Sequence, residues 1–493
     1  MFFSKEMIAQ WKDKCEQDRR FAEAFEALEQ QVSCIDATWI EEKRSQMAHL
    51  KERADIYGGG KIFRYGNEMR KLSQLLLDMA VVFAAKQESC AGMFREIFEI
   101  LLWEPWCFQG RFNGWKSDLW TAGMGINTAL AWELVREELT DEENKLVKTA
   151  IWERGFLPVY EEWVQPKTKI HALDTMGHNW WAVCVSAAGA VLLTLGEEGA
   201  EGYAQKLDEV TRSMQDWFDY SGNVGLNKHP NFGTEGDFLE YVSYMTYGLS
   251  NFCVFYTLLE QQENGPKMDV DRILEKIPDF VLDNLIWTGE GLMCADFGDN
   301  SLGGSTMELW YFLSAKYERK DLLDAANEIY TLKDPYEMFF YPVHLPEKKR
   351  ELPTLAVYQN SGHAVLRTGQ DKSDLVFVMK AGESWNHNHL DAGTFELAIN
   401  GEKCITDSGT CTYSNPLYLS YYVQPCAHNT ITFDGQGQWP GQQQEGTRYP
   451  GCFDSWSECN YRICKNQVIP TLFNRASMRN LSIILSIYTL NPI

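Results

Sequence analysis

Histidine is the residue type whose placement in this chain most strongly suggests chemistry. Nine histidines occur in 493 residues, yet His387, His389 and His428 lie close together in the last quarter of the sequence. Residues two apart in an extended segment point to the same face, so His387 and His389 would bring two imidazoles to one surface. With Asp407 they match a common zinc ligand set. A lone histidine is usually a hydrogen-bonded core or surface residue, so from the residues alone both interpretations stay open.

A second polar and aromatic concentration lies nearer the middle of the chain. His178 and Asn179 precede an apolar segment, where they would either face a cleft from the start of a helix or cap its free N–H groups. Further on, Tyr241, Tyr244 and Tyr247 follow one another at helical spacing. Such a stripe is typical of a core, but a cleft lined by Trp and Tyr also suits sugar rings, and the chain holds 17 Trp and 22 Tyr.

Carboxylates in the same part of the chain offer a different chemistry. A glycoside hydrolase needs two carboxyl groups that flank the scissile bond. Acidic residues are abundant here, and most are expected to be solvated. The candidates for such a pair are Asp118, Asp174, Glu235, Asp237 and Glu240.

Charge and cysteine content exclude several classes of protein. Lys and Arg number 45 against 69 Asp and Glu, so the net charge is −24 and the pI about 4.9. Such a chain repels polyanions at long range, so we expect no nucleic-acid partner, and an acidic polymer would need a local basic cleft. The 13 cysteines include no Cys-x-x-Cys pair, which argues against a disulfide framework and a thiolate zinc site.

The start of the sequence lacks the apolar core of a signal peptide, because charged residues interrupt it early. The longest apolar run, residues 180–195, is short for a membrane span. We therefore expect a cytoplasmic protein with no membrane partner.

Periodicity predicts helices through the first two-thirds of the chain. Apolar residues from Leu119 to Leu134 recur at three- and four-residue steps, and Thr140 with Glu143 forms a capping box that opens the next helix. Residues 1–342 are therefore expected to form an all-α domain of packed hairpins. Similar helical segments occur at 66–87, 92–104, 178–195, 203–219, 239–260, 270–286 and 305–331.

The pattern changes after residue 342. The charged, proline-bracketed stretch 343–353 is expected to be a solvated linker. Beyond it, side chains alternate from Phe395 to Ile399, and Asn400-Gly401 is a favoured hairpin turn. A similar run from Asn429 to Gly435 predicts a further strand and turn. Residues 354–493 are expected to form an antiparallel β-sandwich.

Several ordered segments resemble the heparinase II/III-like polysaccharide lyases. The resemblance implies an incomplete (α/α) toroid followed by an antiparallel β-sandwich, an α+β multidomain layout that agrees with the periodicity. Because few residues follow Gln438, the sandwich is expected to be truncated. The segments are His387 to Phe395, Gly401 to Tyr413, Ala427 to Ile431 and Asp434 to Gln438, with weaker similarity at Asp118, Gly177 to Trp180 and Glu240 to Gly248.

The resemblance implies β-elimination at a uronic acid within an acidic polysaccharide or oligosaccharide, which leaves a 4,5-unsaturated uronate. This reaction needs the substrate carboxylate neutralised, a base at C5 and an acid at the departing oxygen. By similarity, Asn179 and His178 would bind the carboxylate. Tyr244 would be the acid, and on some epimers the base, while His387 would be the partner base.

The resemblance implies further roles for residues around this group. His389, Asp407 and His428 would hold a structural zinc. Substrate contacts are expected from Trp180, Glu240, Tyr247 and Tyr413, while Tyr418 and Tyr422 compete with Tyr413 for the position of the family's second tyrosine.

Two other functions remain as alternatives. A glycoside hydrolase on the same helical toroid would depend on an acid such as Glu240 or Asp237, and a catalytically inactive relative would bind saccharide without turnover. The polymer itself stays open among heparan sulfate, other glycosaminoglycans, alginate and related uronans, as does the oligomeric state. Five basic residues are expected as surface charges that could also bind anions: Arg111, Lys116, Lys228, Arg367 and Lys380.

Overall fold

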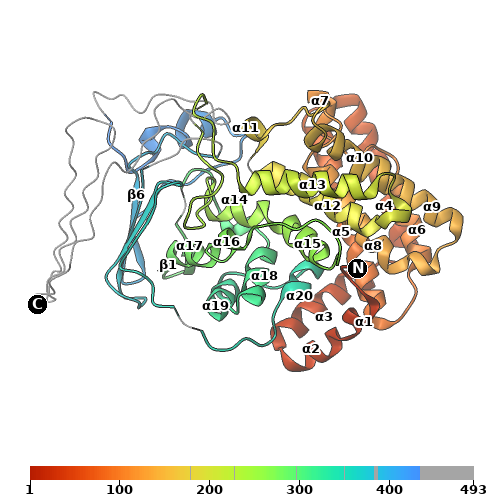
Figure 1. Cartoon of the computed structure of the whole chain (residues 1–493), viewed down its shortest axis with the longest axis horizontal. Coiled ribbons are helices and arrows are strands. Elements are labelled where there is room, and N and C mark those ends of the chain that lie inside the picture. The colour runs from red at the N-terminus through yellow and green to blue at the C-terminus, as the bar shows by residue number, and fades with distance from the viewer. Residues whose placement is uncertain (178, 227, 296, 349, 382–386, 433–493) are drawn as a thin grey trace, which may run out of the picture.

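Helices make up most of the chain as far as Phe340, and strands of a single sheet follow from Leu355 (Figure 1). The computed structural model describes residues 1–432 except 178, 227, 296, 349 and 382–386, and it does not describe the side chains of 111, 112 and 304. In Figure 1 the helices fill the right and centre of the view, and the sheet stands at their left. The expected layout of a helical part followed by an antiparallel β part is confirmed.

Helices occupy the predicted segments, but 239–260 and 305–331 each form two helices, and helices α1 to α4 precede the first predicted segment. Thr140 accepts from the N–H of Glu143 while the carboxylate of Glu143 accepts from the N–H of Thr140, so the expected capping box is present. The bounds are α1 Lys5–Ala9, α2 Trp11–Gln17, α3 Arg19–Ser33, α4 Ala37–Tyr57, α5 Gly60–Lys86, α6 Ala91–Leu101, α7 Gly110–Asn113, α8 Leu119–Val135, α9 Asp141–Ala150, α10 Leu157–Val159, α11 Leu173–Met176, α12 Asn179–Gly199, α13 Tyr203–Phe218, α14 Tyr241–Gly248, α15 Ser250–Glu260, α16 Asp271–Leu274, α17 Ile277–Asp283, α18 Glu308–Lys316, α19 Lys320–Ile329 and α20 Pro335–Phe340.

Helices α8 and α12 form the centre of the helical part. Helix α8 packs between α5 and α12, and α12 also contacts α13 and α15. Gly189 lets α12 approach α15, because a Cβ at this position would lie 2.4 Å from the Phe255 ring. Of the helices described, α12 alone is long and apolar enough to cross a membrane, but 89% of its apolar window is buried inside the fold. It is therefore packed as a core helix.

A short hairpin interrupts the helical part where a helix was expected to run through residues 270–286. Helix α17 ends at Asp283, and β1 (Leu285–Thr288) then pairs antiparallel with β2 (Gly291–Cys294). The turn between them contains Gly289 and Gly291, and Gly291 has φ +120°. Glycine at a positive φ favours a turn over a helix. The predicted helical segment is confirmed over α16 and α17 and is wrong only at its end, where residues 285 and 286 belong to β1.

The five-stranded sheet is an antiparallel meander in the order β3-β4-β5-β6-β7. Asn400 and Gly401 both have positive φ, 53° and 77°, so the predicted hairpin turn joins β6 to β7. The expected strand from Asn429 is not formed over its described residues 429–432, and its remainder lies outside the described part. The strands are β3 Leu355–Tyr358, β4 His363–Arg367, β5 Leu375–Lys380, β6 Phe395–Ile399 and β7 Glu402–Ile405.

One face of this sheet packs against the helical part. Val365, Val376 and Val378 form a buried cluster with Tyr241 at the start of α14 and with Phe297 after β2.

The segment predicted as a solvated linker also contacts the helical part. In this segment, Arg350 donates to the buried carboxylate of Asp283 at 2.5 Å. The sheet is thereby held beside α14.

Candidate active site

Tyr244 and His387 lie face to face where α14 meets the loop after β5. Their ring centroids are 3.6 Å apart and the planes differ by 14°. Tyr413, from the loop after β7, places its hydroxyl 3.2 Å from the hydroxyl of Tyr244 and 3.2 Å from Nδ1 of His387. The structure thus brings together three of the residues that the sequence nominated.

Asp299 anchors this group, and no sequence pattern had nominated it. Its Oδ2 accepts from the Tyr413 hydroxyl at 2.6 Å and lies 3.1 Å from Nδ1 of His387. The signal in the sequence is slight: Gly298-Asp299-Asn300 reads as a polar turn. Only the fold shows that the turn faces His387.

The loop backbone at His387 is held in an unusual conformation. His387 has φ +63°, a left-handed value that costs a residue with a side chain about 1–3 kcal/mol. Its carbonyl accepts from the N–H of Asp299 at 3.0 Å. Gly298 permits this approach, because a Cβ there would lie 2.3 Å from the same carbonyl oxygen. The segment 298–299 therefore fixes both the backbone and the ring of His387.

The protonation of the group follows from these contacts. Burial by itself would lower the pKa of His387, but the hydrogen bond and charge of Asp299, together with the charge of Glu240, outweigh it and raise that pKa. Burial would raise the pKa of Asp299, and His387 in turn lowers it below the ordinary value. Burial, and then the charge of Asp299, raise the pKa of both Tyr244 and Tyr413. The phenols therefore keep their protons at neutral pH.

Glu240 connects the start of α12 to His387. Its Oε2 accepts from the backbone N–H of Asn179 at 3.0 Å and from Asn179 Nδ2 at 2.8 Å. Its Oε1 lies 3.9 Å from Nε2 of His387. A carboxylate at a helix N-terminus is favourable because it meets the positive end of the helix dipole. Asn179 therefore lies close to His387, and its side-chain amide donates a hydrogen bond to Glu240.

The other nominated residues of the helical part lie elsewhere or are not described. Trp180 packs edge to face on Trp115, with ring centroids 6.1 Å apart. Tyr247 faces a separate cavity that Arg70 and Asn127 also line. His178 lies outside the described residues.

The carboxylates considered for a hydrolase pair are mostly occupied in structural roles. Asp118 caps α8 and accepts from the N–H of Gln109 at 2.7 Å. Asp237 accepts from the N–H of Ser361 at 2.8 Å, and Asp174 from the Tyr220 hydroxyl at 2.5 Å. Glu235 is exposed, with Lys276 at 3.8 Å. Glu240 alone of this set lies beside His387.

The residues expected to hold zinc lie behind His387. Asp407 Oδ2 is 2.7 Å from Nδ1 of His428, and the rings of His389 and His428 are 5.2 Å apart between centroids. His389 is buried, and within the described residues neither of its ring nitrogens has a hydrogen-bond partner. Nε2 of His428 lies 2.9 Å from the carbonyl oxygen of Tyr422. The unpartnered imidazole of His389 and the donor types fit a metal site, but the ligand atoms of the three residues do not all lie within 4.8 Å of one another, and His428 would have to exchange a partner.

Three basic residues expected at the surface are buried. Lys228 donates to the carbonyl of Leu173 at 2.5 Å. Arg367 donates to the backbone carbonyls of Asp283 and Leu285. Lys380 forms a fully buried ion pair with Asp391 at 2.5 Å. These contacts explain the burial, because a charged side chain in a core needs polar partners. Of the other two, Lys116 is exposed with Glu161 at 3.0 Å, and the side chain of Arg111 lies outside the described part.

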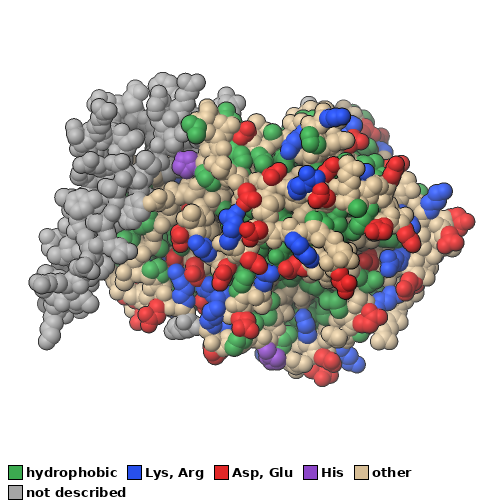
Figure 2. Space-filling view, in the orientation of Figure 1, with side chains coloured by type: hydrophobic (Ala, Val, Ile, Leu, Met, Phe, Trp, Pro, Cys, Tyr) green, Lys and Arg blue, Asp and Glu red, His purple; other side chains and the backbone are tan. Residues whose placement is uncertain are grey.

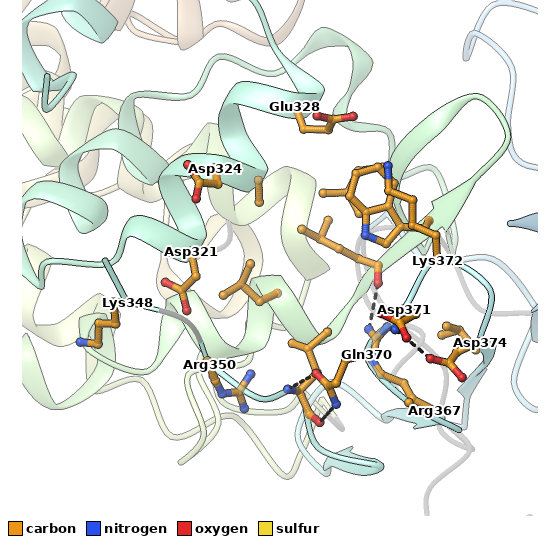
Figure 3. Close-up of a pocket in the computed structure, with 18 of the residues that line it drawn as sticks. Asp321, Asp324, Glu328, Lys348, Arg350, Arg367, Gln370, Asp371, Lys372 and Asp374 are labelled. Carbon is orange, nitrogen blue, oxygen red and sulfur yellow. Dashed lines mark hydrogen bonds between the residues drawn. The ribbon is translucent and has the colours of Figure 1, made fainter. Parts of the chain in front are cut away.

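A cavity of about 490 Å³ lies between α19, the β1–β2 hairpin and the turn from β4 to β5 (Figure 3). Its charged residues are largely paired with protein groups: Lys372 lies 3.5 Å over the Trp287 ring, and Arg350 and Arg367 make the contacts described above. None of the Tyr244–His387 group lines it. The cavity is therefore separate from the candidate site.

The chain is similar to known proteins in part of its sequence and in its fold. Residues 350–451 match the family model described as Heparinase II/III-like, C-terminal. Two heparin-sulfate lyases are similar to this chain: that of Pedobacter heparinus is 37% identical over 82 residues (16% of this chain and 12% of that protein), and that of Bacteroides thetaiotaomicron is 30% identical over 95 residues (17% and 14%). These matches span about an eighth of the relatives' own length.

Two solved structures share the fold over a longer stretch. A crystal structure of heparinase III has a TM-score of 0.53 at 15% identity, covering 75% of this chain and 55% of that one. A mutant heparan sulfate lyase from Pedobacter heparinus has a TM-score of 0.52 at 13% identity, covering 85% and 59%. Residues 350–451 therefore match a Heparinase II/III-like, C-terminal model, and the chain shares the fold of these two solved structures.

Proposed function

We propose that this chain is a polysaccharide lyase that cleaves uronate-containing glycans by β-elimination. The observation that carries the proposal is the stacked Tyr244–His387 pair, with Tyr413 and Asp299 hydrogen-bonded around it. An imidazole and two phenols within hydrogen-bond reach of one another supply both a base and an acid for neighbouring atoms of one sugar ring. The short matches to heparin-sulfate lyases support the same reaction.

In the proposed reaction His387 acts through Nε2, because Nδ1 is directed to Asp299. Neutral Nε2 takes the C5 proton, and the electrons of the C–H bond become the C4–C5 double bond. The C4–O bond breaks, and the phenol of Tyr244 protonates the departing oxygen. No water is added, so the products are a new chain end and a 4,5-unsaturated uronate. Asn179, once released from Glu240, would donate to the substrate carboxylate.

Among uronate polymers, heparan sulfate is the first substrate to test, because the similar proteins and structures bear its name. Alginate is the useful contrast, since it carries uronates without sulfate or amino sugar.

We also propose that His389, Asp407 and His428 hold zinc, supported by the buried and unpartnered imidazole of His389. Zinc there would be structural, joining the loop of His387 to the end of β7. Metal analysis of the purified protein beside His389→Ala tests this proposal: equal zinc content in both proteins contradicts it.

Ultraviolet absorbance of the conjugated alkene, recorded with a panel of uronate polymers, tests the lyase proposal. We expect a product band with the wild-type protein and a loss of rate of about 10²- to 10⁴-fold in Tyr244→Phe and His387→Ala, the range for a missing acid or base. Reducing ends without the alkene would instead indicate a hydrolase. Binding without any product would indicate an inactive relative.

A further inference from the structure

Three carboxylates meet at a place remote from the Tyr244–His387 group. Glu308 is the first residue of α18, Asp334 is the N-cap of α20, and Glu337 lies in the first turn of α20. One oxygen from each lies within 4.8 Å of the other two. In the described part of the chain, no other trio of His, Cys, Asp or Glu brings its ligand atoms so close.

This cluster forms no ion pair with the described residues, although the charge of Lys333 lowers the pKa of Asp334 against the effect of burial. Glu308 and Glu337 are buried, with 6% and 0% of their surface exposed. Within the described residues, no Lys, Arg or His nitrogen lies within 4.0 Å of any of the three carboxylates. Like charges at this spacing repel strongly in a partly buried site. Burial and this repulsion raise the pKa of Glu308 and of Glu337, so the cluster is stabilised either by bound protons or by a cation from outside the chain.

The backbone positions two of the carboxylates, and one oxygen of the third has no hydrogen-bond partner among the described residues. Glu337 accepts from the N–H groups of Met307 and Lys333 at 3.0 and 3.1 Å, and Asp334 accepts from the N–H of Glu337 at 3.0 Å. Oε2 of Glu308 is buried without a hydrogen-bond partner. A buried carboxylate oxygen without a partner is costly unless something binds it.

A path and room for an ion are present. Glu308 and Asp334 both line a cavity of about 300 Å³, which Thr306, Asn127 and Tyr336 also line. Asp334 is partly exposed, so the cluster is reachable from this cavity. Water in the cavity would complete the coordination of an ion held by three carboxylates.

We propose that Glu308, Asp334 and Glu337 form a divalent-cation site that takes Ca²⁺. All three offer oxygen, the ligand of hard cations, and Ca²⁺ accepts oxygens at about 2.3–2.6 Å, so two of its ligands lie up to about 5 Å apart. The observed spacing meets this limit. Mg²⁺ demands a near-ideal octahedron at about 2.1 Å and keeps several of its waters, so a site made of three carboxylates suits Ca²⁺ better.

A cation at this site would link the start of α18 to the start of α20, and α18 contacts α14, the helix that carries Tyr244. Trp310 of α18 donates to Thr246 of α14 at 2.9 Å. A cation at the start of α18 would thus stabilise the support of α14 and take no part in the chemistry. Its effect is expected in thermal stability and in metal binding, both of which are measurable without substrate.

The test uses the full chain, stripped of metal with a chelator and titrated with CaCl₂ by calorimetry while its melting temperature is followed. We expect saturable binding and a rise in melting temperature, with affinity at least about tenfold lower in Glu308→Gln, which keeps the side-chain shape but removes a charge. Glu328→Gln, at an exposed position of α19, should bind like wild type. His389→Ala should also keep the calcium response, which separates this site from the proposed zinc.

Asp334→Asn is the second variant, because Asn is also a good N-cap and preserves the start of α20. It should fold, as judged by circular dichroism, and bind Ca²⁺ at least about tenfold more weakly. Absence of binding in the wild-type protein would overturn the proposal. So would wild-type affinity in both Glu308→Gln and Asp334→Asn.

Discussion

Asp299 is the residue on which the candidate site depends most, although it touches no reacting atom in the proposed mechanism. Its Oδ2 accepts a hydrogen bond from the Tyr413 hydroxyl and lies within hydrogen-bond distance of His387 Nδ1. A carboxylate in this position fixes the tautomer of an imidazole, so that the proton sits on Nδ1 and the lone pair on Nε2. The same carboxylate keeps the Tyr413 ring beside Tyr244.

Asp299→Asn should therefore damage the chemical step. The amide can donate to Nδ1, which would move the proton to Nε2 and remove the base, as in other Asp–His pairs. We expect kcat to fall by about 10²-fold or more with little change in KM, measured by alkene absorbance. Asp324→Asn on the exposed side of α19 is the matched control. A rise in KM alone would contradict the assigned role.

At the scale of elements, β4 meets the start of α14 through His363. Its ring stacks on Tyr241, with centroids 4.1 Å apart and planes 6° apart, and neither nitrogen has a hydrogen-bond partner among the described residues. Burial, together with the charge of Lys380 and against that of Asp391, lowers the pKa of His363 to about 3. The folded protein therefore holds this imidazole neutral.

Acid should destabilise the fold through this buried imidazole. The unfolded chain takes up a proton below about pH 6.5 and the folded chain does not, so stability is complete above that pH and falls as pH drops toward the folded value. At pH 5 the loss from His363 is about 2 kcal/mol. His363→Phe keeps the stacking and should show a shallower decline of melting temperature between pH 7 and 5. Parallel declines in the two proteins would refute this.

The elements were more predictable from the sequence than the site was. Thr140 and Glu143 are three residues apart, so their capping box depends on local geometry alone. The choice among Tyr241, Tyr244 and Tyr247 depended on where α14 begins: Tyr241 has φ +63° and turns to the sheet, which leaves Tyr244 for His387. Asp299 is distant in sequence from both of its partners, so periodicity carried no signal for it.

At the scale of the whole molecule, the proposed substrate and the enzyme carry charge of the same sign. The formal net charge is −24, and Figure 2 shows acidic and basic side chains interspersed on the visible face without a continuous basic track. Near the reacting group the charged neighbours are Glu240 and Asp299, which His387 partly balances. Long-range attraction therefore does not assist the encounter with a polyanion.

Added salt should consequently help this enzyme at low ionic strength. The Debye length falls from about 30 Å at 0.01 M to about 8 Å at 0.15 M, which screens repulsion between the protein and an acidic chain. We expect kcat/KM on a uronate polymer to rise severalfold over this range with kcat unchanged, and to rise less on a disaccharide, which carries fewer charges. A fall in kcat/KM with salt would mean that a basic cleft dominates binding, because counterion release and attraction both weaken as salt increases.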